Sequence, residues 1–171
     1  MVRARRGITP ARLAPSTTGT YAARVKHARG TAVTALTLAD ANRLIEAAFA
    51  KGAELGCKPL TVAVLDHAGT LLAFQRQAPS GLARADIAIG KARAAMGLGI
   101  NSRKISEMAE KRPHFIAGVM SASTGGPFIP VAGGVLIADG SGAVGISGDT
   151  SDNDEACALA GILAVGRKPA E

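Results

Sequence analysis

Four acidic side chains lie within seven residues near the end of the chain, in the sequence GISGDTSDNDEACALAG. They are Asp149, Asp152, Asp154 and Glu155. Carboxylates this close together can bind a metal ion, transfer protons, or accept hydrogen bonds from the unpaired N–H groups at the start of a helix. A calcium loop needs a glycine at its sixth position and a glutamate at its twelfth. Neither is present when the positions are counted from Asp149 or Asp152.

An Ala-rich run follows these acids and predicts a helix. Acidic side chains are favoured at a helix N-terminus because they complement its dipole. Ser151 and Asp154 also have the spacing of a capping box. We therefore expect these acids mainly to cap the final helix, with a contribution to a binding or catalytic site as the alternative.

Three histidines are the other side chains that could hold a metal, namely His27, His67 and His114. None has a second His or Cys at the spacing of zinc ligands, so a zinc site is not expected. A haem iron needs only one protein side chain as an axial ligand, so a haem site stays open. The serines and threonines that follow His114 have no spacing that defines a catalytic triad.

Three charged residues share a predicted Ala-rich helix. Asp86 and Arg93 are two turns apart on one face, whereas Lys91 is offset from Asp86 by about 140°. These side chains could form a pocket wall that binds a carboxylate, or they could simply keep the helix surface soluble. The pattern supports both interpretations equally.

The elements that position these residues follow from the apolar pattern. Apolar residues recur at steps of three and four from Thr37 to Gly56, which predicts a helix capped by Thr37 with Asp40 three positions later. Further helices are expected over residues 82–99, 102–112 and 154–166.

Two hairpins are predicted between these helices. Each has β-branched and apolar runs on either side of a short Gly-containing loop. They cover residues 60–66 with 70–77, and residues 133–139 with 142–149. Residues 114–131 combine small polar residues with Gly and Pro, which predicts a long loop of the kind that often carries function. Antiparallel hairpins between helices indicate an α+β domain, not a doubly wound parallel sheet.

Charge and composition exclude several classes of protein. The net charge is +7, but residues 1–35 carry seven basic and no acidic side chains, so residues 36–171 are neutral. Aromatic residues make up 3% of the chain, which leaves little for stacking on nucleic acid. No apolar run is long enough to span a membrane. We expect residues 1–35 to be a flexible basic tail, with a targeting segment or an over-extended gene start as alternatives.

The two cysteines, Cys57 and Cys157, are 100 positions apart and form no C-x-x-C pair. Twin arginines occur in the tail, but the apolar segment of an export signal does not follow them. We therefore expect a cytoplasmic protein with reduced, buried thiols. The small-residue composition predicts helix surfaces that are covered by self-association.

Several stretches together resemble the GlcG/HbpS family, also called the haem-degrading or PduO C-terminal-like domain. They are LTLADANRLIEAA, VAVLDHAGTLLAFQR, ADIAIGKARAA, the GGV from Gly133, and VGISGDTSDNDEACALAG. The most specific element is G-x-S-G, then five intervening residues, then Asp-Glu and an Ala-rich helix. The resemblance assigns residues 36–168 to one domain of this family.

The resemblance implies a profilin-like fold, with a five-stranded antiparallel sheet between helices, that assembles into homo-oligomers. It implies a haem-binding protein, with haem degradation or a redox-linked role as known variants. A catabolic enzyme or accessory protein acting on a small organic acid or carbonyl compound is the alternative. Nucleic acid and membranes are not expected as partners.

Candidate site residues follow from these two functions. For an enzyme, the proton-transfer candidates are Asp66, Asp86 and Asp154. For binding of an anionic group, a porphyrin or its propionates, the candidates are Arg76, Lys91, Arg93, Thr124, Gly133 and Gly134. Family members ligate haem through a Thr or a His, which makes His114 the candidate axial ligand, with Thr124 and His27 as rivals.

Overall fold

The computed structural model of the chain describes residues 24–26 and 32–171. The predictions made for most of the basic tail, and for His27 as a haem ligand, lie outside these residues. Within the tail, β1 (Arg24–Lys26) pairs antiparallel with β2 (Ala32–Thr34).

The core of the fold is one antiparallel sheet with the strand order β4-β3-β6-β5. Its strands are β3 (Thr61–Asp66), β4 (Leu71–Arg76), β5 (Gly134–Leu136) and β6 (Gly142–Ser147). Both predicted hairpins are therefore confirmed, and β3 and β6 join them at the centre of the sheet. The expectation of five strands is wrong, because the described sheet has four.

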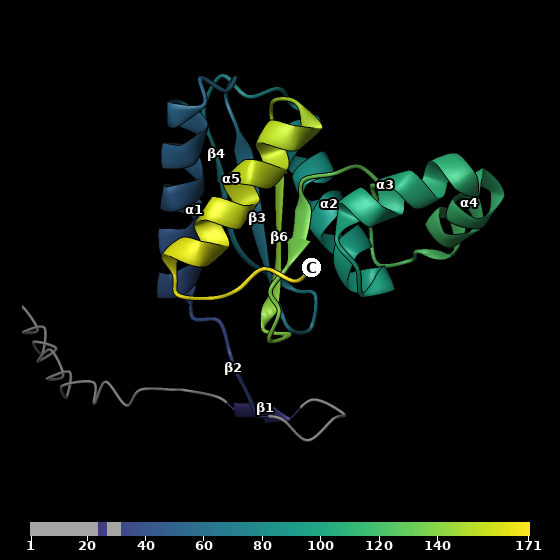
Figure 1. The fold of residues 1–171 in the computed structure, drawn as a ribbon, viewed down its shortest axis with the longest axis horizontal. Coiled ribbons are helices and arrows are strands. Elements are labelled where there is room, and N and C mark those ends of the chain that lie inside the picture. The colour runs from purple at the N-terminus through teal and green to yellow at the C-terminus, as the bar shows by residue number, and fades with distance from the viewer. Residues whose placement is uncertain (1–23, 27–31) are drawn as a thin grey trace, which may run out of the picture.

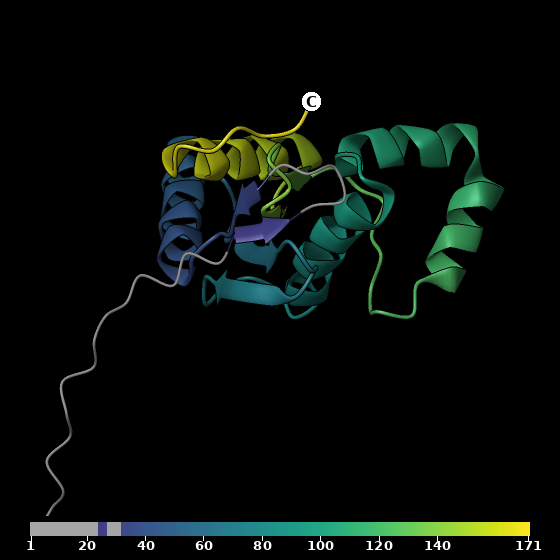
Figure 2. The same cartoon turned by 90° about the horizontal axis from the view of Figure 1, so that it is seen from below.

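Helices cover both faces of this sheet, which confirms the α+β architecture (Figures 1 and 2). They are α1 (Leu38–Glu54), α2 (Arg84–Leu98), α3 (Ser102–Lys111), α4 (Pro113–Ala122) and α5 (Ser151–Ala164). One face carries α1 and α5 and the other carries α2, while α3 and α4 project to one side beyond α2. In the described part of the chain, none of the helices has both the length and the apolar character needed to cross a bilayer.

Alternation along the strands decides which helix each side chain meets. Val62 and Val64 of β3 belong to the large core cluster with α1 and α5, whereas Leu65 packs with Ala92 of α2. The approach of α2 depends on Gly145 of β6. A methyl group at that position would overlap the carbonyl oxygen of Ala88.

The first helix forms as its sequence predicts. The hydroxyl of Thr37 accepts a hydrogen bond from the N–H of Asp40 at 3.1 Å, and the Asp40 carboxylate accepts the N–H of Thr37 in return. This confirms the capping box. The buried side of the helix, which includes Leu44 and Ile45, packs on the sheet.

The prediction of a long loop over residues 114–131 is wrong for its first half, because residues 114–122 belong to α4. Pro113 stands in the first turn of this helix, where its fixed φ and missing N–H are tolerated. Ile116 is buried against Ile105 of α3 and Phe128 of the following loop. The small residues that obscured the helix in the sequence lie at its C-terminal end, so the irregular segment begins only at Ser123.

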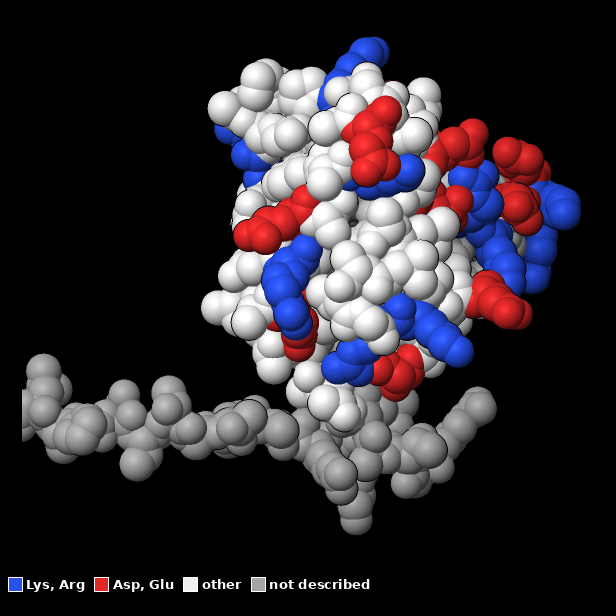
Figure 3. All heavy atoms as spheres, turned by 60° about the vertical axis from the view of Figure 1, so that its left-hand side comes forward, with Lys and Arg blue, Asp and Glu red and all other residues white. Residues whose placement is uncertain are grey.

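Acidic and basic side chains are interspersed on the face that carries α1 (Figure 3). Two ion pairs on α1 contribute to this mixture, Arg43 with Asp40 and Lys51 with Glu54. No broad area of one sign is visible on this face of the described chain. Its mixed charge agrees with the neutral balance of residues 36–171 in the sequence.

Candidate functional site

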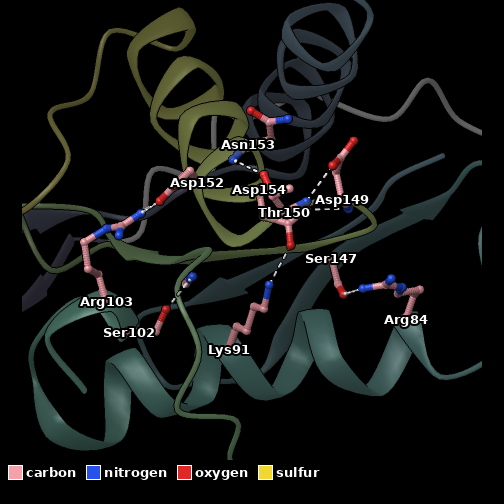
Figure 4. A network of polar contacts seen from close by, with 11 residues as sticks. Arg84, Lys91, Ser102, Arg103, Ser147, Asp149, Thr150, Asp152, Asn153 and Asp154 are labelled. Atoms are coloured by element: carbon pink, nitrogen blue, oxygen red, sulfur yellow. Dashed lines mark hydrogen bonds and ion pairs between the residues drawn. The ribbon is translucent and has the colours of Figure 1, made fainter. Parts of the chain in front are cut away.

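A buried ion pair joins the two helical layers. The Lys91 ammonium group of α2 lies 2.6 Å from Oδ2 of Asp154 in the first turn of α5 (Figure 4). The two side chains are only 3% and 1% exposed. The second carboxylate oxygen of Asp154 accepts the N–H of Asp149 at 3.1 Å. Both charged groups are thus removed from water but have polar partners.

Of the two glycines in the GGV sequence, Gly133 packs against this ion pair and Gly134 packs against the backbone of Lys91. Gly133 has φ +114°, which favours glycine, and a methyl group there would lie 2.9 Å from both the Asp154 Cβ and the Lys91 Nζ. Gly134 donates its N–H to the hydroxyl of Ser102 at 2.7 Å. Larger residues at these positions would push the chain away from the ion pair. The predicted candidates Lys91, Asp154, Gly133 and Gly134 are therefore brought together.

Burial dominates the electrostatics of the pair. It raises the pKa of Asp154, against the attraction of the Lys91 ammonium group. It also lowers the pKa of Lys91, against the attraction of the Asp154 carboxylate. Removal from water disfavours both charged forms, so the two pKa values move towards each other. Proton transfer within the pair therefore costs less than it would in water.

The acidic stretch does not cap α5 in the predicted way. The cap is Thr150, not Ser151, and its hydroxyl accepts the N–H of Asn153 at 3.3 Å. Asp154 belongs to the ion pair and not to a capping box. Asp149 accepts the N–H of Lys58 at 2.7 Å, which connects the start of α5 to the segment after α1. Hydrogen bonds from the N–H groups of Lys58 and Thr150 lower the pKa of Asp149.

The other two acids of the stretch bind the same arginine. Arg103 of α3 lies 2.5 Å from Asp152 and 2.5 Å from Glu155. Because the Arg103 and Asp152 side chains are exposed, the bridge contributes little to stability. It holds the projecting α3 against the first turns of α5.

Two further polar contacts lie on the α2 face of the sheet. Arg84 donates to the hydroxyl of Ser147 at 3.1 Å (Figure 4). The hydroxyls of Thr61 and Ser80 are 2.9 Å apart. Burial sets the directions of the Lys91 and Asp154 pKa shifts, and the charge of Arg84 adds to the lowering of the Lys91 pKa and opposes the raising of the Asp154 pKa. Sequence reasoning did not select Arg84 or Ser147. The available signal was the G-x-S-G motif, in which Ser147 is the serine.

Two predicted carboxylates lie away from the ion pair. Asp66 ends β3 at the opposite end from Thr61, and its side chain accepts the N–H groups of Ala68 and Thr70 within the hairpin turn. Asp86 is exposed in the first turn of α2. The three proton-transfer candidates therefore do not share one site.

The two predicted arginines support neighbouring loops. Arg76 donates to the carbonyl oxygens of Ala78 and Ser80, in the segment between β4 and α2. The guanidinium group of Arg93 lies against Gly126 in the segment after α4. Neither side chain reaches the Lys91–Asp154 pair through a described contact.

His114 and Thr124 stand at opposite ends of α4. Both residues are exposed. Beside them the helix presents Phe115, which is 41% exposed, and Met120, which is 43% exposed. The guanidinium group of Arg112 lies 4.5 Å from the centre of the Phe115 ring. We call this surface, formed by residues 111–124, the α4 surface.

A pocket of about 330 Å³ lies away from the α4 surface. It is bounded by the end of α1, by the segment that leads into β3, and by the residues that follow β4. Its lining includes Phe49, Cys57, Leu60 and Gln77. We call it the Cys57 pocket. Within residues 24–26 and 32–171, no group of three or more His, Cys, Asp or Glu side chains is placed to hold a metal ion.

The sequence matches one family model, described as haem degrading protein HbpS-like, over residues 36–163. This range covers most of the domain that the sequence predicts. No curated protein sequence matches the chain.

Solved structures with the same fold include three that are 26% identical to this chain. PduOC in complex with haem covers 80% of this chain and 99% of its own, with a TM-score of 0.70. The ORFY protein of Klebsiella pneumoniae covers 77% and 90%, with a TM-score of 0.67. HbpS covers 78% and 92%, with a TM-score of 0.64.

Proposed function

The chain belongs to the HbpS-like family of haem-degrading proteins, and we propose that it binds haem on the α4 surface. The observation that carries the location is the exposed imidazole of His114 beside exposed apolar side chains on one short helix. The haem complex of a structural relative supports haem as the ligand.

The side chains on the α4 surface have the chemistry that haem requires. An imidazole is a common axial ligand of haem iron. The exposed Phe115 and Met120 offer apolar area to the porphyrin. Lys111 and Arg112 precede His114 and can pair with the propionates, with Arg93 as a further cation near Gly126. Bound haem would supply an iron centre capable of redox chemistry, and haem degradation or a redox-linked role is the extension of this proposal.

His114 and Thr124 are alternative ligands, not partners. His114 is the second residue of α4 and Thr124 lies two residues after its end, so the ten positions between them correspond to about 15 Å at the rise of a helix. One iron cannot reach both within a single copy of the chain. We favour His114, because a neutral imidazole is a much better iron ligand than a hydroxyl group.

The Cys57 pocket fits haem less well. A cysteine ligates haem iron as a thiolate. Burial and the nearby carboxylate of Asp149 raise the pKa of the Cys57 thiol, which disfavours that form. No histidine is among the residues that line this pocket.

Titration of the purified protein with haemin tests the proposal. The Soret band should shift and saturate near one haem per chain. His114→Ala should weaken binding at least tenfold and change the band, whereas His67→Ala, in the β3–β4 turn, should leave both unchanged. A spectrum that stays that of free haemin would contradict haem binding. A loss confined to Thr124→Val would move the ligand to the other end of α4.

We make three broader proposals for this chain. We propose a profilin-like arrangement of the sheet, a cytoplasmic location, and self-association through the α4 surface, with haem bound where two copies meet. Exposed apolar side chains on a projecting helix would be covered by a second copy. Residues 36–168 would then be the assembling domain, with residues 1–35 as an accessory tail.

A further inference from the structure

The two cysteines, 100 residues apart in the sequence, lie together in the fold. Cys57 follows α1 and is half-buried, while Cys157 is fully buried in α5. Both cysteines lie beside Gly52 of α1. A methyl group at Gly52 would be 3.7 Å from the Cys157 sulfur, and Gly52 and Cys57 line the same pocket. Each thiol is also among the groups that influence the pKa of the other, as expected for neighbouring side chains.

The Cys57 pocket gives only one of the two sulfurs a route to solvent. Cys57 is one of the residues that line the pocket. The volume of the pocket, about 330 Å³, is within the range of small-molecule sites. Cys157 is not among the lining residues, and it belongs to the core cluster behind Cys57. A molecule that enters the pocket therefore meets Cys57 first.

We propose that Cys57 and Cys157 form a thiol–disulfide exchange site, at which a small disulfide entering the Cys57 pocket converts the pair into an intramolecular disulfide. Cys57 is the attacking thiol, because it is accessible and Cys157 is not. Cys157 is the resolving thiol, because it lies directly behind Cys57. This site is separate from the α4 surface and does not depend on haem.

The exchange balances in two steps. Cys57 loses its proton, and its sulfur attacks one sulfur of the small disulfide RSSR, which forms a mixed disulfide and releases one RS⁻ that takes up the proton. The Cys157 thiol then loses its proton, and its sulfur attacks the Cys57 sulfur and releases the second RS⁻, which takes up that proton. The protein gives up two electrons and two protons, and RSSR becomes two molecules of RSH.

Burial of the two thiols and the carboxylates around them make this exchange slow at neutral pH. Burial and the carboxylates of Asp149 and Asp154 raise the pKa of Cys57. Burial raises the pKa of Cys157 to about 12, with Asp154 acting in the same direction and Lys51 against it. The thiolate is the reacting form, so the rate should rise steadily as the pH is increased from 7 to 9.

An oxidised pair would fix the end of α1 to the first turns of α5. Cys157 stands one turn after Asp154, and the N–H of Lys58, next to Cys57, already binds Asp149 at 2.7 Å. The new covalent bond would close a loop that contains most of the domain, which restricts the unfolded chain. Oxidation should therefore raise the melting temperature.

The test uses the full chain, freed of metal by a chelator and incubated with oxidised glutathione. Because the chain has only two cysteines, the product should be lighter by two hydrogen atoms, remain a single chain on non-reducing gels and give no reaction with a thiol reagent. Proteolysis without reduction should release one peptide pair joined through Cys57 and Cys157. Dithiothreitol should restore the original mass and melting temperature.

Two variants assign the roles of the cysteines. Cys157→Ala should stop at a glutathione adduct on Cys57, and Cys57→Ser should form no adduct while folded. If Cys157→Ala does not fold, the peptide map of the wild-type chain still decides the question. The proposal is wrong if wild-type protein stays reduced at pH 9, stops at the mixed disulfide, or forms only disulfides between chains.

Discussion

Lys91 Nζ lies 2.6 Å from Asp154 Oδ2, although the two residues belong to helices on opposite faces of the sheet. The contact passes beside Gly133, which directly precedes β5 and accepts the N–H of Ile146 of β6. The ion pair joins the helices on the two faces of the sheet, and its two side chains have almost no contact with water. A pair of this kind contributes little net stability when intact, but losing one partner leaves an isolated buried charge.

Replacing Lys91 alone should therefore destabilise the domain strongly. Lys91→Met should lower the free energy of unfolding by about 3–5 kcal/mol, because the Asp154 carboxylate loses its counter-charge. The double variant Lys91→Met/Asp154→Leu should recover most of this loss. Urea denaturation followed by circular dichroism measures both. Arg43→Ala, which breaks the exposed pair with Asp40, is the control and should cost less than about 1 kcal/mol. Equal losses for Lys91→Met and Arg43→Ala would contradict the role of the buried pair.

The Asp149 carboxylate should stabilise the fold in a pH-dependent way. Hydrogen bonds from the N–H groups of Lys58 and Thr150 lower its folded pKa below the ordinary value of 3.8. Its stabilisation is then fully present above pH 3.8 and is lost as the pH falls through the lower folded pKa. Asp149→Asn should lower the melting temperature at pH 7, and the difference should shrink as the pH falls below 3.8. Glu46→Gln, on the exposed side of α1, is the charge-matched control. A difference for Asp149→Asn that stays constant down to pH 2 would exclude this linkage.

The close approach of α2 to the sheet should make Gly145 intolerant of substitution. A methyl group there would overlap the backbone of Ala88 in α2. Gly145→Ala should therefore lower the free energy of unfolding by about 1–3 kcal/mol or more. Gly118→Ala is the matched control, because no atom lies within 4 Å of the added methyl group. It should stabilise α4 by about 0.5–1 kcal/mol, because Gly disfavours a helix interior relative to Ala. Thermal unfolding of both variants measures the contrast, and effects of the same sign would contradict it.

The α4 surface should mediate self-association. Light scattering of the wild-type protein should give a mass well above the 17.2 kDa of one chain. The double variant Phe115→Glu/Met120→Lys should shift the mass towards the monomer while its circular dichroism stays unchanged. Leu163→Lys changes an exposed apolar residue of α5 and should leave the mass unaltered. A monomeric wild-type protein at micromolar concentration would refute this assembly.

The sequence was sufficient for elements whose signals are local. The Thr37–Asp40 capping box and the apolar repeat defined α1, and β-branched runs around Gly-containing turns defined both hairpins. Each of these depends on interactions among residues a few positions apart. The motifs that support the family assignment are equally local, so the match to the HbpS-like family could also be anticipated.

The tertiary structure decided the features that depend on distant residues. Lys91 and Asp154 are 63 positions apart, and Cys57 and Cys157 are 100 apart. No periodicity links such pairs, because their meeting depends on how α1, α2 and α5 pack on the two faces of the sheet. In the sequence, Asp154 looked like a helix cap and the cysteines like unrelated core residues. Packing brought each of them against a partner in the interior, where removal from water changes what a carboxylate, an amine or a thiol can do.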